Sequence, residues 1–238
     1  MFHVSTIDAI KAAALAAYPE EMCGLVVNGG FVLCENRAAD PREAFSIDPA
    51  LFVEYGAALD AVVHSHPDAP CCPSAADMAQ QVVCAVPFGV VSTDGCSTTD
   101  LLWWGGGVPL APLLGRGFVH GVTDCYGAIA DWYSLERGVA LPVFPRDWAW
   151  WRSGGDLYRD GFERAGFQLI SFSEAAPGDV VLFQLRSDVP NHGAVIDEGG
   201  LMYHHPALDD PVDPFRLARR EPFGRWRKHA THFLRFSP

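Results

Sequence analysis

Long apolar runs are missing from this chain of 238 residues. No stretch reaches the roughly 20 consecutive apolar residues that a membrane-spanning helix needs, and no basic segment followed by an apolar one marks a signal peptide at the N-terminus. We therefore expect a soluble protein made in the cytoplasm. Because 49% of the residues are hydrophobic and only 19% are charged, the chain can build one large domain or two small ones.

Basic side chains are scarce. Seventeen Lys and Arg residues stand against 29 Asp and Glu residues, which gives a net charge of −12. Such a surface repels phosphate, so nucleic acid is an unlikely partner. The basic cluster from Arg216 to Lys228 is interpreted as a solvated C-terminal face. Seven cysteines without a signal peptide argue against a complete disulfide framework, and reduced thiols are expected.

The pattern of apolar residues and turn formers predicts two α+β domains. In the first half it predicts a helix over 5–18 capped by Ser5 or Thr6, a hairpin of strands 23–27 and 31–34, and a helix over 49–58. A strand over 60–63, a helix over 74–83 and a strand over 88–92 follow. In the second half it predicts a helix over 125–136 capped by Asp124, and strands over 180–185, 193–196 and 201–204.

Glycines, prolines and paired tryptophans between residues 102 and 117 predict a connection without regular structure. We place the domain boundary near residue 107, which gives domains of residues 1–106 and 107–238.

Two histidines and an aspartate in the first half suggest a metal site. His64 and His66 are two apart on extended backbone and project to the same side, and Asp77 lies in the helix expected to begin at Ser74. Two imidazoles and one carboxylate leave a fourth tetrahedral position open, as in catalytic zinc sites. Surface histidines are the alternative interpretation, and Cys71 with Cys72 are less favoured soft ligands.

Together with Glu21, this segment resembles the JAMM metalloprotease motif, in which an upstream glutamate precedes His-x-His-Pro, six residues and Ser-x-x-Asp. The resemblance implies that His64, His66 and Asp77 bind Zn²⁺. It further implies that Glu21 is the base that activates water and that Ser74 donates to the developing oxyanion.

A possible nucleophile stands in the second half. Cys125 follows Asp124 at an expected helix N-terminus, where the helix dipole favours thiolate over thiol. His192 opens an expected strand and is the candidate base. If the strands are joined by a three-residue turn at residues 197–199, His192 and His204 pair directly across a hairpin, and one ring can orient the other. A buried structural thiol is the alternative for Cys125.

This half resembles the NlpC family of papain-like cysteine peptidases through Asp124-Cys125, Pro177-Gly178-Asp179 and His192-Gly193-Ala194. The resemblance implies a helix packed on an antiparallel sheet, with Cys125 as nucleophile, His192 as base and His204 as the third polar residue. Tyr126-Gly127 stands where the family usually has Ser-Gly. His120 and the Cys125 backbone amide are both candidates for the oxyanion donor.

A JAMM-like half followed by an NlpC-like half is similar to the tail-assembly protein K family of lambda-like phages. The resemblance implies a tail-tip or tail-assembly factor that is made in the host cytoplasm, assembled with or into the virion, and partnered by other tail-tip proteins. It also implies a peptidase acting on peptidoglycan stem peptides. Two alternatives remain: a zinc peptidase that processes tail proteins or isopeptide bonds, and a structural tail-tip component without cell-wall activity.

Overall fold

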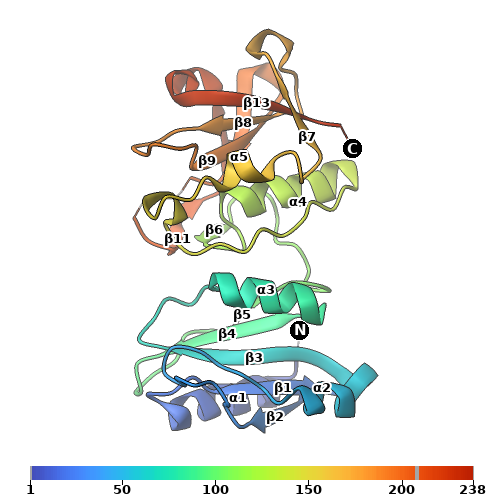
Figure 1. Cartoon of the computed structure of the whole chain (residues 1–238), viewed down its shortest axis with the longest axis vertical. Coiled ribbons are helices and arrows are strands. Elements are labelled where there is room, and N and C mark those ends of the chain that lie inside the picture. The colour runs from blue at the N-terminus through green and yellow to red at the C-terminus, as the bar shows by residue number, and fades with distance from the viewer. Residues whose placement is uncertain (1, 207–208, 238) are drawn as a thin grey trace. The chain divides into compact units, whose positions relative to one another are not determined.

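The computed structural model describes residues 2–206 and 209–237, which form two compact units (Figure 1). One unit comprises the residues up to Pro73 together with Ala79–Pro109, and the other comprises Ser74–Met78 and the residues from Leu110 onward. No helix among the described residues is long and apolar enough to cross a membrane. Both units combine helices with a sheet, as the α+β prediction requires.

The first unit is built on a five-stranded sheet in the order β2-β1-β3-β4-β5. Strands β3 and β4 are parallel, and the other neighbours are antiparallel. In chain order the elements up to residue 109 are α1 (Val4–Ala17), β1 (Cys23–Val27), β2 (Gly30–Cys34), α2 (Pro49–Tyr55), β3 (Leu59–Pro67), α3 (Ala75–Cys84), β4 (Phe88–Thr93) and β5 (Leu102–Trp104). The part of α3 up to Met78 is assigned to the second unit.

Strand β3 separates a packed core from the histidine pair. Its residues Ala61 and Val63 are fully buried in one cluster with Ile10 and Ala14 of α1. Because successive side chains of a strand point to opposite faces, His64 projects away from α1. Its ring stacks on Phe45, with ring centroids 4.4 Å apart. Because the side chains of β3 alternate, the histidine pair lies on the face of the sheet opposite α1.

Two expectations for this unit were wrong. The N-cap of α1 is His3, whose ring accepts from the Ser5 amide, and Thr6 instead donates its hydroxyl to the Gly29 carbonyl of the hairpin turn. The segment expected to lack regular structure contains β5, in which Trp104 pairs with Phe88. Its large apolar residues complete the edge of the sheet before the glycines begin.

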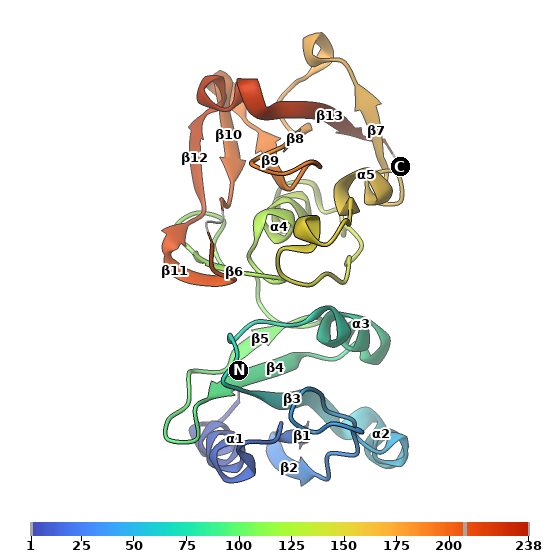
Figure 2. The ribbon, with the colours of Figure 1, turned by 60° about the vertical axis from the view of Figure 1, so that its left-hand side comes forward.

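The second unit contains a six-stranded antiparallel sheet in the order β12-β10-β9-β8-β13-β7, and a two-stranded sheet of β11 and β6 (Figure 2). Its elements are β6 (Gly117–Val119), α4 (Cys125–Arg137), α5 (Leu157–Gly161), β7 (Phe167–Ile170), β8 (Val180–Phe183), β9 (His192–Ile196), β10 (Leu201–His204), β11 (Val212–Leu217), β12 (Arg219–Pro222) and β13 (Ala230–Phe236).

Helix α4 packs on one face of the six-stranded sheet. Asp124 caps the helix by accepting from the Gly127 amide, as predicted. Ile129 and Trp132 of α4 share a buried cluster with Leu182 of β8 and Val195 of β9. A helix covering an antiparallel sheet is the arrangement that the sequence predicts, and it fixes the position of Cys125 at the first turn.

The hairpin of β9 and β10 differs from the expected register. His204 lies opposite Ala194, so His192 is its diagonal rather than its direct partner. The turn is longer than three residues, because a short 3₁₀ helix, Glu198–Gly200, connects the two strands. A shift of two residues preserves the face to which each side chain points, so both rings still lie on the same side of the sheet.

Candidate functional site

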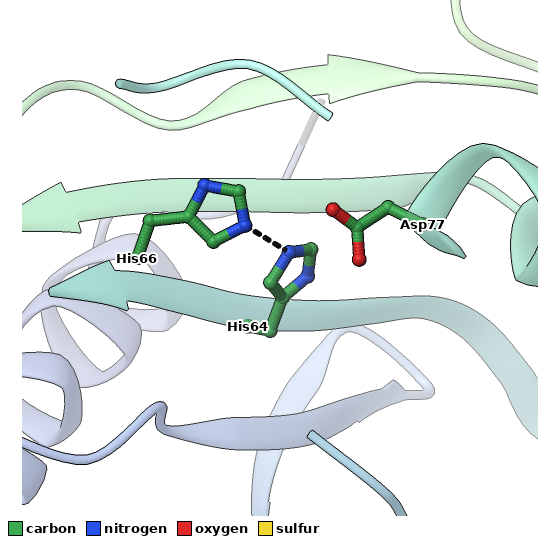
Figure 3. Close-up of side chains that lie close together, drawn as sticks. All are labelled: His64, His66 and Asp77. Carbon is green, nitrogen blue, oxygen red and sulfur yellow. Dashed lines mark hydrogen bonds between the residues drawn. The ribbon is translucent and has the colours of Figure 1, made fainter. Parts of the chain in front are cut away.

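His64 and His66 of β3 and Asp77 of α3 lie close together (Figure 3). Their ligand atoms all lie within 4.8 Å of one another, and the two Nε2 atoms are 3.0 Å apart. Two zinc bonds of about 2.05 Å at the tetrahedral angle place nitrogens roughly 3.3 Å apart, close to this separation. The three side chains therefore fit a common ion, as the sequence predicts.

Hydrogen bonds to the backbone orient the candidate ligand His66. Its Nδ1 lies 3.1 Å from the Pro70 carbonyl oxygen, which can only accept, so Nδ1 carries the proton. The Nε2 lone pair then points toward Nε2 of His64, 3.0 Å away. This is the usual way in which a carbonyl fixes the tautomer of a metal-binding histidine.

Ser74 contacts the candidate carboxylate ligand, and Glu21 lies close in sequence to the strand that pairs with β3. The hydroxyl and the amide of Ser74 both donate to Asp77 Oδ2, at 2.7 and 2.8 Å. Ser74 thus orients the candidate carboxylate ligand in this conformation. Glu21 is 8% exposed and lies two residues before Cys23, which pairs with His64. Cys71, an alternative ligand by sequence, directs its thiol to the carbonyls of Val90 and Asp100.

A buried ion pair supports Cys125 in the second unit. Nη2 of Arg146 donates to both carboxylate oxygens of Asp124, at 2.8 and 2.6 Å. Asp124 also accepts from the amides of Gly121 and Gly127. Burial opposes ionisation of Asp124, yet Arg146 and these contacts bring its pKa down to about 2. A charged, fully hydrogen-bonded aspartate therefore precedes the cysteine.

The Cys125 sulfur lies between Tyr158 and the start of β9. Its distance to the Tyr158 hydroxyl is 3.2 Å, and the Gly193 amide donates to it as well. Within the described residues, the side-chain partner of this thiol is Tyr158 rather than His192. Burial, followed by the adjacent Asp124, raises the pKa of Cys125 to about 11. The helix N-terminus therefore does not by itself produce the thiolate expected from the sequence, and the thiol needs a base.

His192 and His204 form a buried pair on the same sheet. Nε2 of His192 lies 2.9 Å from Nδ1 of His204, and Nε2 of His204 lies 2.6 Å from Oε1 of Glu221. Burial is the main reason that the pKa of His192 lies well below its ordinary value and that the pKa of His204 falls to about 3. Both shifts favour the neutral form of the two rings.

The candidate oxyanion donors differ in availability. Nε2 of His120 donates to the Arg146 carbonyl at 3.0 Å, and its Nδ1 faces Asp124 at 3.5 Å. His120 is thus engaged in supporting the ion pair. The Cys125 amide, the other candidate, stands at the first turn of α4, where amides lack partners within the helix.

A cavity of about 620 Å³ joins these groups, and both Cys125 and His192 line it. The tryptophans 148, 150 and 151 and Tyr158 form much of its apolar wall. The basic segment near the C-terminus, interpreted from sequence as a solvated face, contributes Arg219, Glu221, Arg225 and Lys228 to the lining.

Sequence analysis missed Tyr158, Glu221 and Arg146. Arg146 follows α4 in a segment without regular structure, and Tyr158 lies in α5, which is too short to show a periodic pattern in the sequence. Glu221 is the acidic residue inside the basic cluster from Arg216 to Lys228, and this reversal of sign is the one signal that could have drawn attention to it.

Models of two known domain families match the two parts of the chain. The model for prokaryotic homologs of the JAB domain (Prok-JAB) matches residues 3–104, and the NlpC/P60 family model matches residues 103–235. These matches define the class, a protein with a JAB-like N-terminal domain and an NlpC/P60 C-terminal domain. They confirm the predicted two-domain fold class.

Two phage proteins align with most of the chain. Tail tip assembly protein K of Escherichia phage N15 is 32% identical over 243 residues, which cover 97% of this chain and 94% of the N15 protein. Tail tip assembly protein K of Escherichia phage lambda is 38% identical over 175 residues, covering 73% and 79%. The chain belongs to the tail tip assembly protein K family, which confirms the resemblance drawn from its motifs.

Solved NlpC/P60 structures are among the similar proteins. An NLP/P60-family lipoprotein from Staphylococcus aureus is 23% identical, with a TM-score of 0.35 and coverage of 53% of this chain and 38% of that chain. The NlpC/p60 domain of the peptidoglycan hydrolase SagA is 16% identical, with a TM-score of 0.35 and coverage of 52% and 89%.

Proposed function

We propose that this chain is a phage tail-tip or tail-assembly protein whose second domain is a cysteine endopeptidase acting on peptidoglycan stem peptides. The observation that carries the proposal is the shared cavity, which is lined both by a cysteine at a helix N-terminus and by a histidine that a second histidine orients. In this assignment Cys125 is the nucleophile, His192 the base and His204 the residue that orients the base.

The reaction is acyl transfer in two steps. Cys125 Sγ loses its proton to His192 and bonds to the carbonyl carbon of the substrate. The C–N bond breaks, the leaving amine takes the proton from His192, and a thioester remains. Water then gives a proton to His192 and its oxygen to the acyl carbon. The C–S bond breaks, the sulfur takes the proton back from His192, and a carboxylic acid and the free thiol result. Because the pKa of Cys125 is raised, the base must act during the attack.

The charge of the cavity supports an acidic peptide as substrate. Although the chain carries a net charge of −12, the cationic side chains lining the cavity outnumber the acidic ones. The cationic ones are Arg146, Arg152, Arg186, Arg219, Arg225 and Lys228, against Asp124, Asp209 and Glu221. Stem peptides carry free carboxylates, and a locally positive cavity attracts them. Amidated stem peptides should accordingly be cleaved less efficiently than the free acids.

Mass spectrometry of muropeptides incubated with the purified chain tests the cysteine site. Wild-type protein should release peptide fragments, and the Cys125→Ala variant should release none. Cys96→Ala, which removes an exposed cysteine, is the matched control and should cleave like wild type. Cleavage retained by Cys125→Ala would reject the assignment.

We further propose a JAMM-type zinc peptidase site in the first domain, with His64, His66 and Asp77 holding Zn²⁺. When bound there, zinc supplies Lewis acidity toward a carbonyl oxygen. Ser74 orients Asp77 through its hydroxyl, and Glu21 is proposed to take a proton from the attacking water. An isopeptide or tail-protein bond cleaved during assembly is the candidate substrate of this half.

Metal analysis and a pair of neighbouring glutamates test the zinc site. Wild-type protein should retain close to one zinc per chain after dialysis, and His66→Ala should retain much less. Glu21→Gln should keep the metal but fail to process tail proteins, whereas the control Glu20→Gln, at an exposed position, should process normally. Full processing by Glu21→Gln is incompatible with Glu21 as base.

The relatives support a place in the phage tail, because both carry the name tail tip assembly protein K. We propose synthesis in the host cytoplasm, assembly with or into the virion, other tail-tip proteins as partners, and a division into domains of residues 1–106 and 107–238. The alternative is a structural tail-tip component without peptidase activity. Normal infectivity of phage carrying His64→Ala and Cys125→Ala together would favour that alternative.

A further inference from the structure

We propose that Glu221 is a positioning residue that extends the cysteine site to four members, by fixing the tautomers of His204 and His192. This inference rests on the proposed peptidase function of the second domain. It concerns a residue 17 positions beyond His204 in sequence, on the neighbouring strand β12. Glu221 pairs with Met202 in the ladder, so it reaches His204 diagonally across the two strands.

The order of the hydrogen bonds determines where each proton lies. A carboxylate can only accept, so His204 donates from Nε2 to Glu221 Oε1 across 2.6 Å. In a neutral ring the other nitrogen then has a lone pair, and Nδ1 of His204 accepts. His192 must therefore donate from Nε2 across 2.9 Å, which leaves its own Nδ1 without a proton. A bare Nδ1 is the atom that can accept the thiol proton.

Without Glu221 this order is lost. Each histidine can then carry its proton on either nitrogen, and half of the arrangements leave His192 with a protonated Nδ1 that cannot act as a base. The carboxylate also stabilises positive charge on the pair, because the Glu221 charge raises the pKa of His192 against the effect of burial. Glu221 thus favours both the reactive tautomer and the imidazolium that forms when the thiol is deprotonated.

Two arginines hold Glu221 in place. Arg219 donates to Oε1 from Nε at 3.2 Å, and its Nη2 lies 3.1 Å from the same oxygen. Arg225 Nη1 lies 3.5 Å from Oε2. The side chain of Glu221 is only 11% exposed. Trp226 lies edge-on against the His204 ring at 4.9 Å and so limits its rotation. The Glu221 side chain is therefore held in one rotamer.

The titration of this network involves charged groups from several strands. His192 is influenced by His204 and His205 of the β10 segment and by Arg219 and Glu221 of β12. The groups that act on the sulfur are different ones, namely Asp124, Arg146 and Tyr158. Replacing Glu221 should therefore change the basicity of His192 and leave the groups around the Cys125 sulfur unchanged.

The test compares Glu221→Gln and Glu221→Ala with wild type in the full chain. Glutamine keeps the shape and one hydrogen-bond acceptor of Glu221 but loses its charge, whereas alanine loses the acceptor and the charge. We expect kcat for muropeptide cleavage to fall at least about tenfold in Glu221→Ala and less in Glu221→Gln, with KM nearly unchanged. The acid limb of the kcat/KM profile should move to lower pH, because His192 becomes a weaker base. The control Glu198→Gln, at an exposed turn, should behave like wild type.

Two measurements without substrate separate this inference from the proposed function. The rate at which iodoacetamide modifies Cys125 at pH 7, followed by peptide mass mapping, should fall in both Glu221 variants. The ¹⁵N imidazole signals of wild type should show His192 protonated at Nε2 and bare at Nδ1. If wild type cleaves no muropeptide, the proposed function fails, and these two measurements still decide the role of Glu221.

Certain results would overturn the role of Glu221. The inference fails if both variants keep wild-type alkylation rates and ¹⁵N signals. It also fails if activity falls only in proportion to a loss of folded protein, with the acid limb unmoved, because a purely structural residue would behave in that way. Since Glu221→Gln preserves size and one hydrogen bond, it remains informative if Glu221→Ala does not fold.

Discussion

Replacing Arg146 by methionine should destabilise the second domain strongly. Arg146 is 7% exposed, and its guanidinium makes contacts of 2.6, 2.8 and 3.1 Å with Asp124. Methionine fills much of the space of the arginine stem but leaves the buried carboxylate without its counter-charge. Breaking such a pair from one side costs about 3–5 kcal/mol, because the remaining charge stays in a poorly solvated site.

For a domain of this size, about 3 kcal/mol corresponds to a fall in Tm of roughly 10 °C. Thermal unfolding followed by near-ultraviolet circular dichroism measures it. The control Arg164→Met removes an exposed arginine and should change the free energy of unfolding by less than about 0.5 kcal/mol.

A double-mutant cycle sharpens the test. Asp124→Asn keeps an acceptor for the helix cap and removes the charge, so the double variant with Arg146→Met no longer buries a lone charge. It should be at least about 1 kcal/mol more stable than the sum of the single losses predicts. The reasoning is refuted if Arg146→Met unfolds like the exposed control, or if the two single losses simply add.

Three further outcomes follow from the same site. The pKa of Asp124 is about 2 in the folded protein, against an ordinary value of 3.8, so its ionisation stabilises the fold by about 2 kcal/mol. This stabilisation should be complete above about pH 4 and should be lost as the pH falls to 2. An acid titration of unfolding without this loss would contradict the ion pair. Gly127→Ala should destabilise the domain by more than about 2 kcal/mol in denaturant unfolding, because the added Cβ meets a backbone carbonyl. The control Gly224→Ala has open space around it and should be nearly neutral. Equal effects of the two variants would show that the close approach at Gly127 is unimportant. Tyr158→Phe should raise the midpoint of Cys125 alkylation by about one pH unit, because the hydroxyl stabilises the thiolate, and a lower midpoint would contradict that role.

Local signals made much of the fold predictable. The cap of α4 was predicted because Asp124 and the helix lie next to each other in sequence. The hairpin of strands 23–27 and 31–34 was predictable because Asn-Gly pairs favour the positive φ that Asn28 and Gly29 adopt between these strands. The closeness of the two histidines was predictable for a similar reason, since strand alternation places His64 and His66 on one side.

Pairing between distant segments was less predictable from the sequence. The register of β9 and β10 depends on the turn, where Gly199 and Gly200 both have positive φ and lengthen the connection beyond three residues. Glu221 reaches the histidine pair only because β12 lies beside β10, and no sequence period reveals that neighbour. The raised pKa of Cys125 likewise depends on burial, which the cap position alone does not indicate.

The tryptophans that line the cavity with Cys125 make ligand binding in this domain measurable by intrinsic fluorescence. Trp148 lies edge-on to His120 with centroids 5.5 Å apart, and Trp150 to Tyr158 with centroids 6.0 Å apart. Any molecule that enters the cavity must alter the surroundings of these indoles, so its arrival changes the emission of the unlabelled protein. Occupancy can then be followed in real time with catalytically silent variants.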